Sequence, residues 1–289
     1  MYRGAGYRTV RFLALTLASL LIVSPAAAQR VAKGGYIENI ALCNGTDRAS
    51  FAVRIDGCTA FIDSGQGTPA ALAVAHNNRG NAYTATGEFD RALVDFDQSI
   101  KLDPGSARAF NNRGAAYLKK GDYDLALQAL DEAIRLKPNY ARARVNRANV
   151  YLKKQQYEQA SRDFDEAIRL EPAMDAAWSG RCWARVILGA LQPALEDCNR
   201  VLTSLPNDAA TYDSRGVIRL KMGQGAAALE DFSTALRFDP KLASAFYGRG
   251  LARLKNGDRA GGDSDIAAAK AINPAIDDDF TRLGLRANN

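Results

Sequence analysis

Histidine is nearly missing from this sequence, and the residue groupings that build most active sites are missing as well. His76 is the only histidine, and it does not lie near the four cysteines in the sequence. Histidine is the commonest metal ligand and general acid or base. The sequence also lacks a glycine-rich phosphate loop and a nucleophile elbow. We therefore expect no catalytic residues, no metal site and no cofactor. The alternative, that the protein is an enzyme, is disfavoured by these absences.

The sequence also lacks an apolar run long enough to span a membrane. The longest run, Phe12 to Val23, has about twelve residues, whereas a spanning helix needs roughly 20. Arg3, Arg8 and Arg11 precede it, and small residues follow as far as Ala28. This layout predicts a signal peptide over residues 1–28, cleaved after Ala28, and hence a periplasmic or secreted protein without a stable membrane span. No cysteine stands directly after the cleavage point, so a lipid anchor is not expected.

No block of one charge sign stands out in the chain. Loss of residues 1–28 removes three arginines and no acidic residue, so the net charge falls from +6 to +3. Basic and acidic residues alternate along the remainder, which is typical of a solvated helical surface. Nucleic-acid binding is not expected, because it usually requires a basic patch or a recognisable motif.

Proline, although infrequent, recurs at a strict interval of 34 residues. A fixed period of this length predicts repeated units that stack into one continuous core. With proline at position 32, the units span 73–106, 107–140, 141–174, 175–208, 209–242 and 243–276. The six prolines are Pro104, Pro138, Pro172, Pro206, Pro240 and Pro274.

Other positions of the unit share this register. Apolar residues recur at helical spacing in two segments of each unit, which predicts two amphipathic helices. Positions 8 and 20 are small, which allows close approach of antiparallel helices. Position 15 is glycine in five of the six units, which suits the turn between the helices, and the proline ends the second helix. Each unit is therefore predicted to be a helical hairpin.

This pattern resembles the tetratricopeptide repeat. The shared features are an aromatic near position 4, as in Trp178, tyrosine at position 11, as in Tyr83, alanine at 20, phenylalanine at 24 and proline at 32. The resemblance implies an all-α, right-handed superhelical solenoid of tetratricopeptide helical hairpins. Residues 77–80 and 95–97 more narrowly resemble exported tetratricopeptide proteins of alphaproteobacteria.

Both ends of the array depart from the repeat. Residues 58–64 resemble residues 198–204, so residues 29–72 are expected to contain a degenerate zeroth hairpin. After the last proline, Ile276, Phe280 and Leu283 fall at i, i+4 and i+7. Residues 277–289 are accordingly predicted to be a capping helix and tail that cover the last hairpin.

Four cysteines can pair in three ways, and export favours their oxidation. Cys182 and Cys198 occupy positions 8 and 24, which lie opposite each other in a hairpin, and Cys43 and Cys58 occupy positions 9 and 24 of the zeroth unit. The register therefore favours a disulfide within each of these hairpins. Buried free thiols are the alternative.

Position 7 is arginine in every unit, and position 23 is aspartate in all but the second, where Ala129 stands. Because buried charges need partners, we expect internal ion pairs that set the stacking register; an anion-binding surface is the alternative. Position 11 changes from tyrosine to arginine in the last three units, at Arg185, Arg219 and Arg253. Either acids such as Glu196 and Glu230 compensate these arginines, or they bind an external acidic group.

The family resemblance implies a partner on the concave surface that the first helices form. We expect a non-catalytic scaffold that binds a protein or extended peptide; the alternatives are a structural subunit of an envelope assembly and a self-associating protein. The candidate groove residues change from polar to apolar along the chain: Asn77, Asn81, Arg108, Asn111, Lys119, Arg142, Asn149, Lys153, Trp183, Val186, Ile187, Val217, Leu220 and Tyr247.

Overall fold

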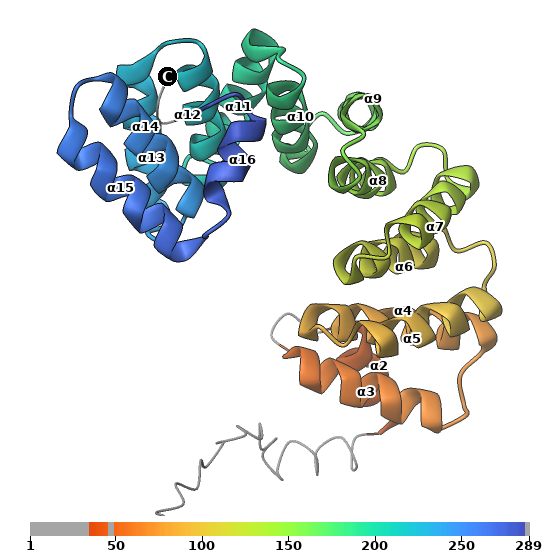
Figure 1. Cartoon of the computed structure of the whole chain (residues 1–289). Helices are drawn as coiled ribbons and strands as arrows, with labels where there is room; N and C mark the ends of the chain where they lie inside the picture. Colours follow the sequence, from red (N-terminus) through yellow and green to blue (C-terminus); the bar gives the residue numbers. More distant parts are fainter. Residues whose placement is uncertain (1–34, 46–48, 287–289) are drawn as a thin grey trace, which may run out of the picture.

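A computed structural model describes residues 35–45 and 49–286, which form fifteen α-helices and no β-strand (Figure 1). The predicted signal peptide lies outside these residues. The helices are α2 (Tyr36–Asn44), α3 (Phe51–Asp63), α4 (Pro69–Thr86), α5 (Phe89–Leu102), α6 (Ala107–Lys120), α7 (Tyr123–Leu136), α8 (Ala141–Lys153), α9 (Tyr157–Leu170), α10 (Asp175–Ile187), α11 (Leu191–Ser204), α12 (Ala209–Lys221), α13 (Gly225–Phe238), α14 (Ala243–Lys255), α15 (Arg259–Ile272) and α16 (Ile276–Arg282).

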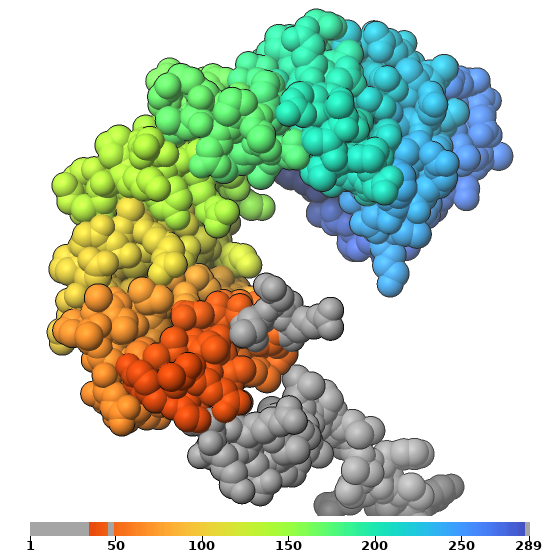
Figure 2. Space-filling model, turned by 180° about the vertical axis from the view of Figure 1, so that it is seen from behind, coloured from red at the N-terminus to blue at the C-terminus, as the bar shows by residue number. Residues whose placement is uncertain are grey.

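Consecutive helices pair as antiparallel hairpins, from α2 with α3 to α14 with α15, and the hairpins stack along a curved axis (Figure 1). The first helices of neighbouring hairpins also contact each other, as α4 contacts α6 and α12 contacts α14. They therefore line the inside of the curve, which Figure 2 shows as an arc around a hollow. The predicted all-α superhelical solenoid is confirmed.

Proline and glycine delimit the helices of each hairpin. Helix α5 ends at Leu102, two residues before Pro104, because the proline ring excludes helical backbone at the preceding residue. Between α4 and α5, Gly87 adopts φ 83°, a left-handed conformation that costs glycine little. The third unit differs, because Gln155 adopts φ 58° at the same position. Gln155 is the only residue other than glycine with positive φ among the residues described.

The core consists of position-24 side chains held between close-packed backbones. Phe96 is fully buried, and a Cβ added at Gly80 would lie 2.8 Å from its Cε1 atom. Phe164 is equally buried, and a Cβ at Gly180 of the next unit would lie 2.2 Å from its Cζ atom. Phe232 shows both contacts, because a Cβ added at Gly216 of its own unit or at Gly248 of the next would lie 2.7 or 2.3 Å from its ring. These contacts join neighbouring units into one core.

Both disulfides join the two helices of a single hairpin. Cys43 of α2 is bonded to Cys58 of α3, and Cys182 of α10 is bonded to Cys198 of α11. All four residues are buried. The pairing expected from the register is confirmed in the structure, and the described cysteines include no free thiol.

The position-7 arginines form an internal ladder of ion pairs. Arg181 donates from Nε and Nη2 to the carboxylate of Asp197 in its own unit, at 2.9 and 2.7 Å. Its Nη1 atom donates to Asp165 of the preceding unit at 2.6 Å. Arg147 bonds Asp163 and Asp131 in the same manner. One guanidinium therefore connects two hairpins, which fixes the register of stacking.

In the second unit the position-7 arginine, Arg113, bonds an aspartate of the preceding unit but has no aspartate at position 23 of its own unit. Ala129 cannot accept a hydrogen bond with its side chain, and Arg113 donates to Asp97 of the first unit at 2.8 Å. In the first unit, Asp95 accepts from Arg79 and also bonds His76, Nδ1 to Oδ1, at 2.9 Å. Burial by itself would raise the pKa of Asp95, but the hydrogen bonds of Arg79 and His76 outweigh it and lower that pKa.

The position-11 arginines use the same carboxylates as the ladder. Arg185 Nη1 lies 2.8 Å from Asp197 Oδ2, and the corresponding distances are 2.9 Å for Arg219 to Asp231 and for Arg253 to Asp265. The carboxylate between two arginines offsets their mutual repulsion. The internal pairing is therefore confirmed, but the suggested partners Glu196 and Glu230 are wrong.

Helix α16 packs against α14 and α15 at the C-terminal end of the array, on the side that faces α10 in Figure 1. Ile276 and Phe280 are buried in the apolar cluster of the last three units. The Phe280 ring lies 4.6 Å from that of Tyr247, and Lys221 Nζ donates to the Leu283 carbonyl oxygen at 2.7 Å. The C-terminal segment is thus attached to the first helices of two different units.

Candidate binding groove

A cavity of about 660 Å³ lies on the concave side of the C-terminal half. One wall comes from the first helices α10 and α12, with Trp183, Ile187 and Val217. The facing wall comes from the C-terminal segment, with Ile276 and Phe280. This volume is typical of sites that bind a small molecule or a few side chains of a partner. The array and its C-terminal helix therefore build the cavity together.

Three of the fourteen candidate groove residues, Trp183, Ile187 and Val217, line this cavity. Val217 is only 1% exposed, so it contributes to the cavity floor. Five other candidates are buried away from it, and their prediction as accessible contacts is wrong. They are Asn77, Asn111, Val186, Leu220 and Tyr247.

The two buried asparagines are structural because they connect consecutive first helices. Asn112 Nδ2 donates to Asn77 Oδ1 at 3.0 Å, and Asn146 Nδ2 donates to Asn111 Oδ1 at 2.8 Å. Position 5 of one unit thus meets position 6 of the next. Both buried carbonyl oxygens thus accept a hydrogen bond inside the protein, and leaving them without one would cost free energy.

The three buried apolar candidates belong to the same cluster as the C-terminal helix. Tyr247 is covered by Phe280, and burial together with a hydrogen bond to Asp277 raises the pKa of its hydroxyl. Leu220 and Val186 pack within this cluster and are 2% and 0% exposed. Sequence reasoning placed them on an open surface because it treated the C-terminal helix only as a cap at the end of the array.

The remaining candidates lie outside the cavity and stay predictions. Four basic side chains are exposed and two asparagines are half-buried, along the N-terminal half of the array. They are Arg108, Lys119, Arg142, Lys153, Asn81 and Asn149.

Asp213 is a cavity residue that the sequence analysis missed. It occupies position 5 of the fifth unit, where the other units hold asparagine, valine, serine or tyrosine. Ser244 Oγ donates to Asp213 Oδ2 at 2.6 Å, whereas Oδ1 is buried and has no hydrogen-bond partner among the described residues. Burial raises the pKa of Asp213 to about 7, and the Ser244 hydrogen bond opposes this rise. Asp213 is the only charged residue at position 5 in the six units, and this difference in the sequence could have identified it as a candidate site residue.

Gln155 borders the cavity from the turn between α8 and α9. Left-handed backbone strains any residue with a Cβ atom, and glycine stands at this position in the other five units. Such strain is often found at functional sites. Among the six turns between the helices of a unit, the one without glycine thus contributes its side chain to the cavity.

Helical hairpins that stack into a curved array with a concave surface are typical of the α-solenoid class of repeat proteins. Sequence profiles of the tetratricopeptide repeat match residues 77–141 and 117–179, and a TPR repeat profile matches residues 216–257. The chain is a tetratricopeptide repeat protein. Proteins of this family are in general non-catalytic scaffolds for protein interaction.

Solved structures share this fold at low sequence identity. A tetratricopeptide repeat protein from Parabacteroides merdae is 17% identical, with a TM-score of 0.63 over 91% of this chain and 100% of that one. YrrB, described as a TPR protein with an unusual peptide-binding site, is 23% identical, with a TM-score of 0.51 over 65% and 95%. The Cut9–Hcn1 hetero-tetramer of the APC/C contains a chain that is 16% identical, with a TM-score of 0.66 over 90% and 54%.

Among curated proteins, none matches this sequence. In the described part of the chain, no helix is both long and apolar enough to cross a membrane.

Proposed function

We propose that this protein is an exported, non-catalytic scaffold that binds a protein or an extended peptide in the concave groove of its C-terminal half. The cavity between the first helices and α16 carries this proposal. It combines apolar walls with a few polar groups, a composition typical of binding sites. The predicted signal peptide and the narrow resemblance to exported proteins support a location in the cell envelope or outside the cell.

Peptide binding fits the geometry because the cavity lies on the concave side of the array, beside partly exposed apolar side chains. Trp183 and Ile187 remain partly exposed beside the buried cluster, so both can bury further apolar surface on binding. Large aromatic side chains in such positions contribute strongly to interfaces. A partner segment that places an apolar side chain against Trp183 would gain this contribution.

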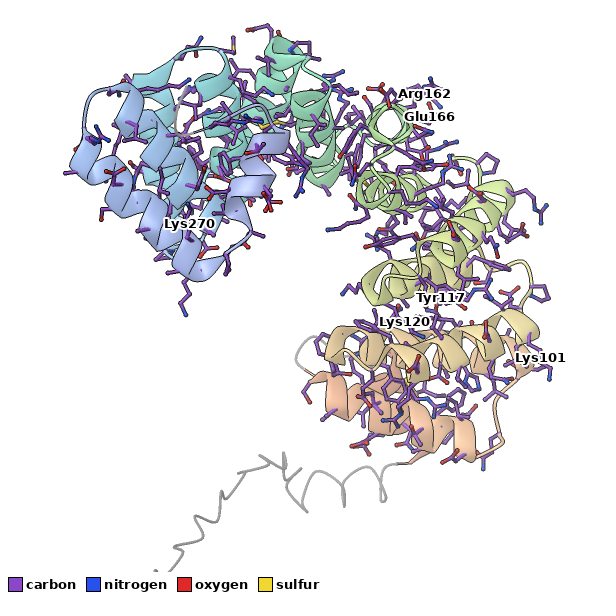
Figure 3. All side chains as sticks on the ribbon, viewed as in Figure 1. Lys101, Tyr117, Lys120, Arg162, Glu166 and Lys270 are labelled. Atoms are coloured by element: carbon purple, nitrogen blue, oxygen red, sulfur yellow. A yellow bond between two sulfur atoms is a disulfide. The ribbon has the colours of Figure 1, made fainter. Side chains whose placement is uncertain are left out.

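Site-specific photo-cross-linking tests the proposal. A photoreactive amino acid at position 187 of the full chain should capture a protein from an envelope extract of the source organism. The matched control carries the same amino acid at Arg162, an exposed residue that projects outward from α9 (Figure 3). We expect capture from position 187 only, and its loss when Trp183→Ala is added. Equal capture from both positions, or none from position 187, would refute the proposal.

Self-association is a second candidate, favoured by apolar side chains at the N-terminal end. Ile37 is 80% exposed, and Phe51 and Tyr36 are also exposed. Exposed apolar side chains at the end of an array could bury this surface against a second copy. Sedimentation velocity of the Ile37→Asp chain distinguishes the two functions: self-association through Ile37 predicts dissociation to a monomer, whereas groove binding alone predicts no change in mass.

A further inference from the structure

The cavity has an unbalanced charge that indicates the chemistry of its ligand. Three charged side chains line it: Asp213, Asp279 and Arg282. Arg282 and Asp279 form an ion pair one turn apart on α16, so they compensate each other. Asp213 has no cationic partner within the described part of the chain, since Ser244 supplies only a neutral hydroxyl. When Asp213 is ionised, the cavity therefore carries one uncompensated negative charge.

The environment of Asp213 is costly for an isolated carboxylate. Its Oδ1 atom is buried without a hydrogen bond from the described residues, beside the apolar walls of the cavity. A buried charge is stabilised when a cation pairs with it, and hydrogen bonds to charged groups are stronger than neutral ones. A ligand that brings a cationic donor would satisfy the carboxylate, whereas an anionic ligand would be repelled.

The other residues that line the cavity could contact the apolar part of such a ligand. Trp183 and Ile187 present apolar surface on one side, and Phe280 does so on the other. Gln155 adds an amide at the rim, held there by the strained backbone of its turn. Apolar walls around one carboxylate that lacks a cationic partner would favour a ligand that joins an apolar group to a cation.

We propose that the cavity binds a cationic, partly apolar segment of the partner, with a lysine ammonium or an arginine guanidinium donating to Asp213 and a neighbouring apolar side chain lying against Trp183 and Ile187. This inference rests on the proposed function, because it assigns the chemistry of the partner that the groove binds.

Arylalkyl probes of one size and three charges test the inference on the full chain. The probes are 3-phenylpropylamine, 3-phenylpropanol and 3-phenylpropionate. The chain has two tryptophans, so Trp178→Phe leaves Trp183 in the cavity wall as the only tryptophan reporter. In fluorescence titrations the amine should bind about tenfold or more tightly than the alcohol, and the propionate should bind most weakly. If the amine binds no better than the alcohol, the inference is wrong.

Variants then assign the preference to one carboxylate. Asp213→Asn keeps the shape and should remove the preference for the amine while leaving alcohol binding within about twofold. Asp278→Asn, an exposed residue of α16 outside the cavity, is the matched control and should leave both affinities unchanged. Ser244→Ala removes the neutral partner of Asp213 and should retain amine binding. Unchanged amine preference in Asp213→Asn, or its loss in Ser244→Ala, would overturn the assignment.

The same variants separate this inference from the proposed function. If cross-linking from position 187 persists in Asp213→Asn but is lost in Trp183→Ala, the groove binds its partner without the carboxylate, and only the inference fails. If the amine series behaves as expected but no protein is captured, the cationic site stands and the proposed function fails.

Discussion

Asp197→Ala is expected to lower the free energy of unfolding by about 3 kcal/mol, because it removes a buried carboxylate shared by two arginines. Asp197 is 1% exposed and accepts hydrogen bonds from Arg181 at 2.9 and 2.7 Å and from Arg185 at 2.8 Å. Its removal leaves two like charges one helical turn apart in a poorly solvated position.

Breaking a buried ion pair by removing one partner costs about 3–5 kcal/mol. We expect the loss of stability in Asp197→Ala to lie at the lower end of this range, because both arginines keep other contacts. Arg181 keeps its hydrogen bond to Asp165 at 2.6 Å. Arg185 keeps a contact with Asp165 at 3.7 Å and one with the Pro193 carbonyl oxygen at 3.4 Å. Adding Arg185→Tyr supplies the residue type of the first three units at position 11, so the double variant should recover part of the loss.

Urea denaturation followed by far-UV circular dichroism measures these differences. The control is Glu166→Ala, which breaks an ion pair with Arg169 on the outer face of α9 (Figure 3). Arg169 is 67% and Glu166 31% exposed, so water screens the pair and the control should lose less than about 0.5 kcal/mol. A loss below about 1 kcal/mol for Asp197→Ala, or one equal to that of the control, would refute the view that the ladder stabilises the stacked hairpins.

Three further predictions follow from local features. Gln155→Gly should raise the free energy of unfolding by about 1 kcal/mol, because glycine adopts the left-handed turn without strain; thermal denaturation should show a higher midpoint, and a lower one would contradict the argument. Mass spectrometry of unreduced digests should find Cys43 linked to Cys58, and replacing both by alanine should cost about 3 kcal/mol; any other linkage would exclude the hairpin pairing. Asp213→Asn should be more stable than the parent above pH 7, because burial raises the folded-state pKa of Asp213 to about 7 and so disfavours the ionised form. This advantage should shrink as the pH falls from about 7 towards the unfolded-state pKa of about 4, where both states are protonated. An advantage that is constant with pH would show that Asp213 does not titrate as described.

Much of the fold could be predicted from the sequence because repeat units place equivalent residues at equal intervals. Arg181 and Asp197 are sixteen residues apart within one hairpin, and their pairing follows from the antiparallel geometry of that hairpin. The second partner of Arg181, Asp165 in the preceding unit, was not predicted. It depends on the angle at which successive hairpins stack, which the period of 34 residues does not specify.

The candidate site was predicted less well than the fold. Sequence reasoning identified Trp183 and Ile187 as groove residues, because the family resemblance implies that their positions belong to the concave surface, and both residues line the cavity. It missed Asp213, since position 5 was considered only as part of a repeating surface. It also placed Tyr247 on an open surface, although Phe280 covers the tyrosine ring.

The sequence by itself determined the repeated hairpin, its helix ends and the pairing of its cysteines. These features depend on spacing within about 34 residues, where backbone geometry relates position directly to contact. Only the tertiary structure decided where the cavity forms. The curvature of the solenoid brings Gln155, Asp213 and Ile276 to one cavity although they lie far apart in the chain. That convergence depends on the sum of many stacking angles and on the fold of the C-terminal segment, and neither leaves a local pattern in the sequence.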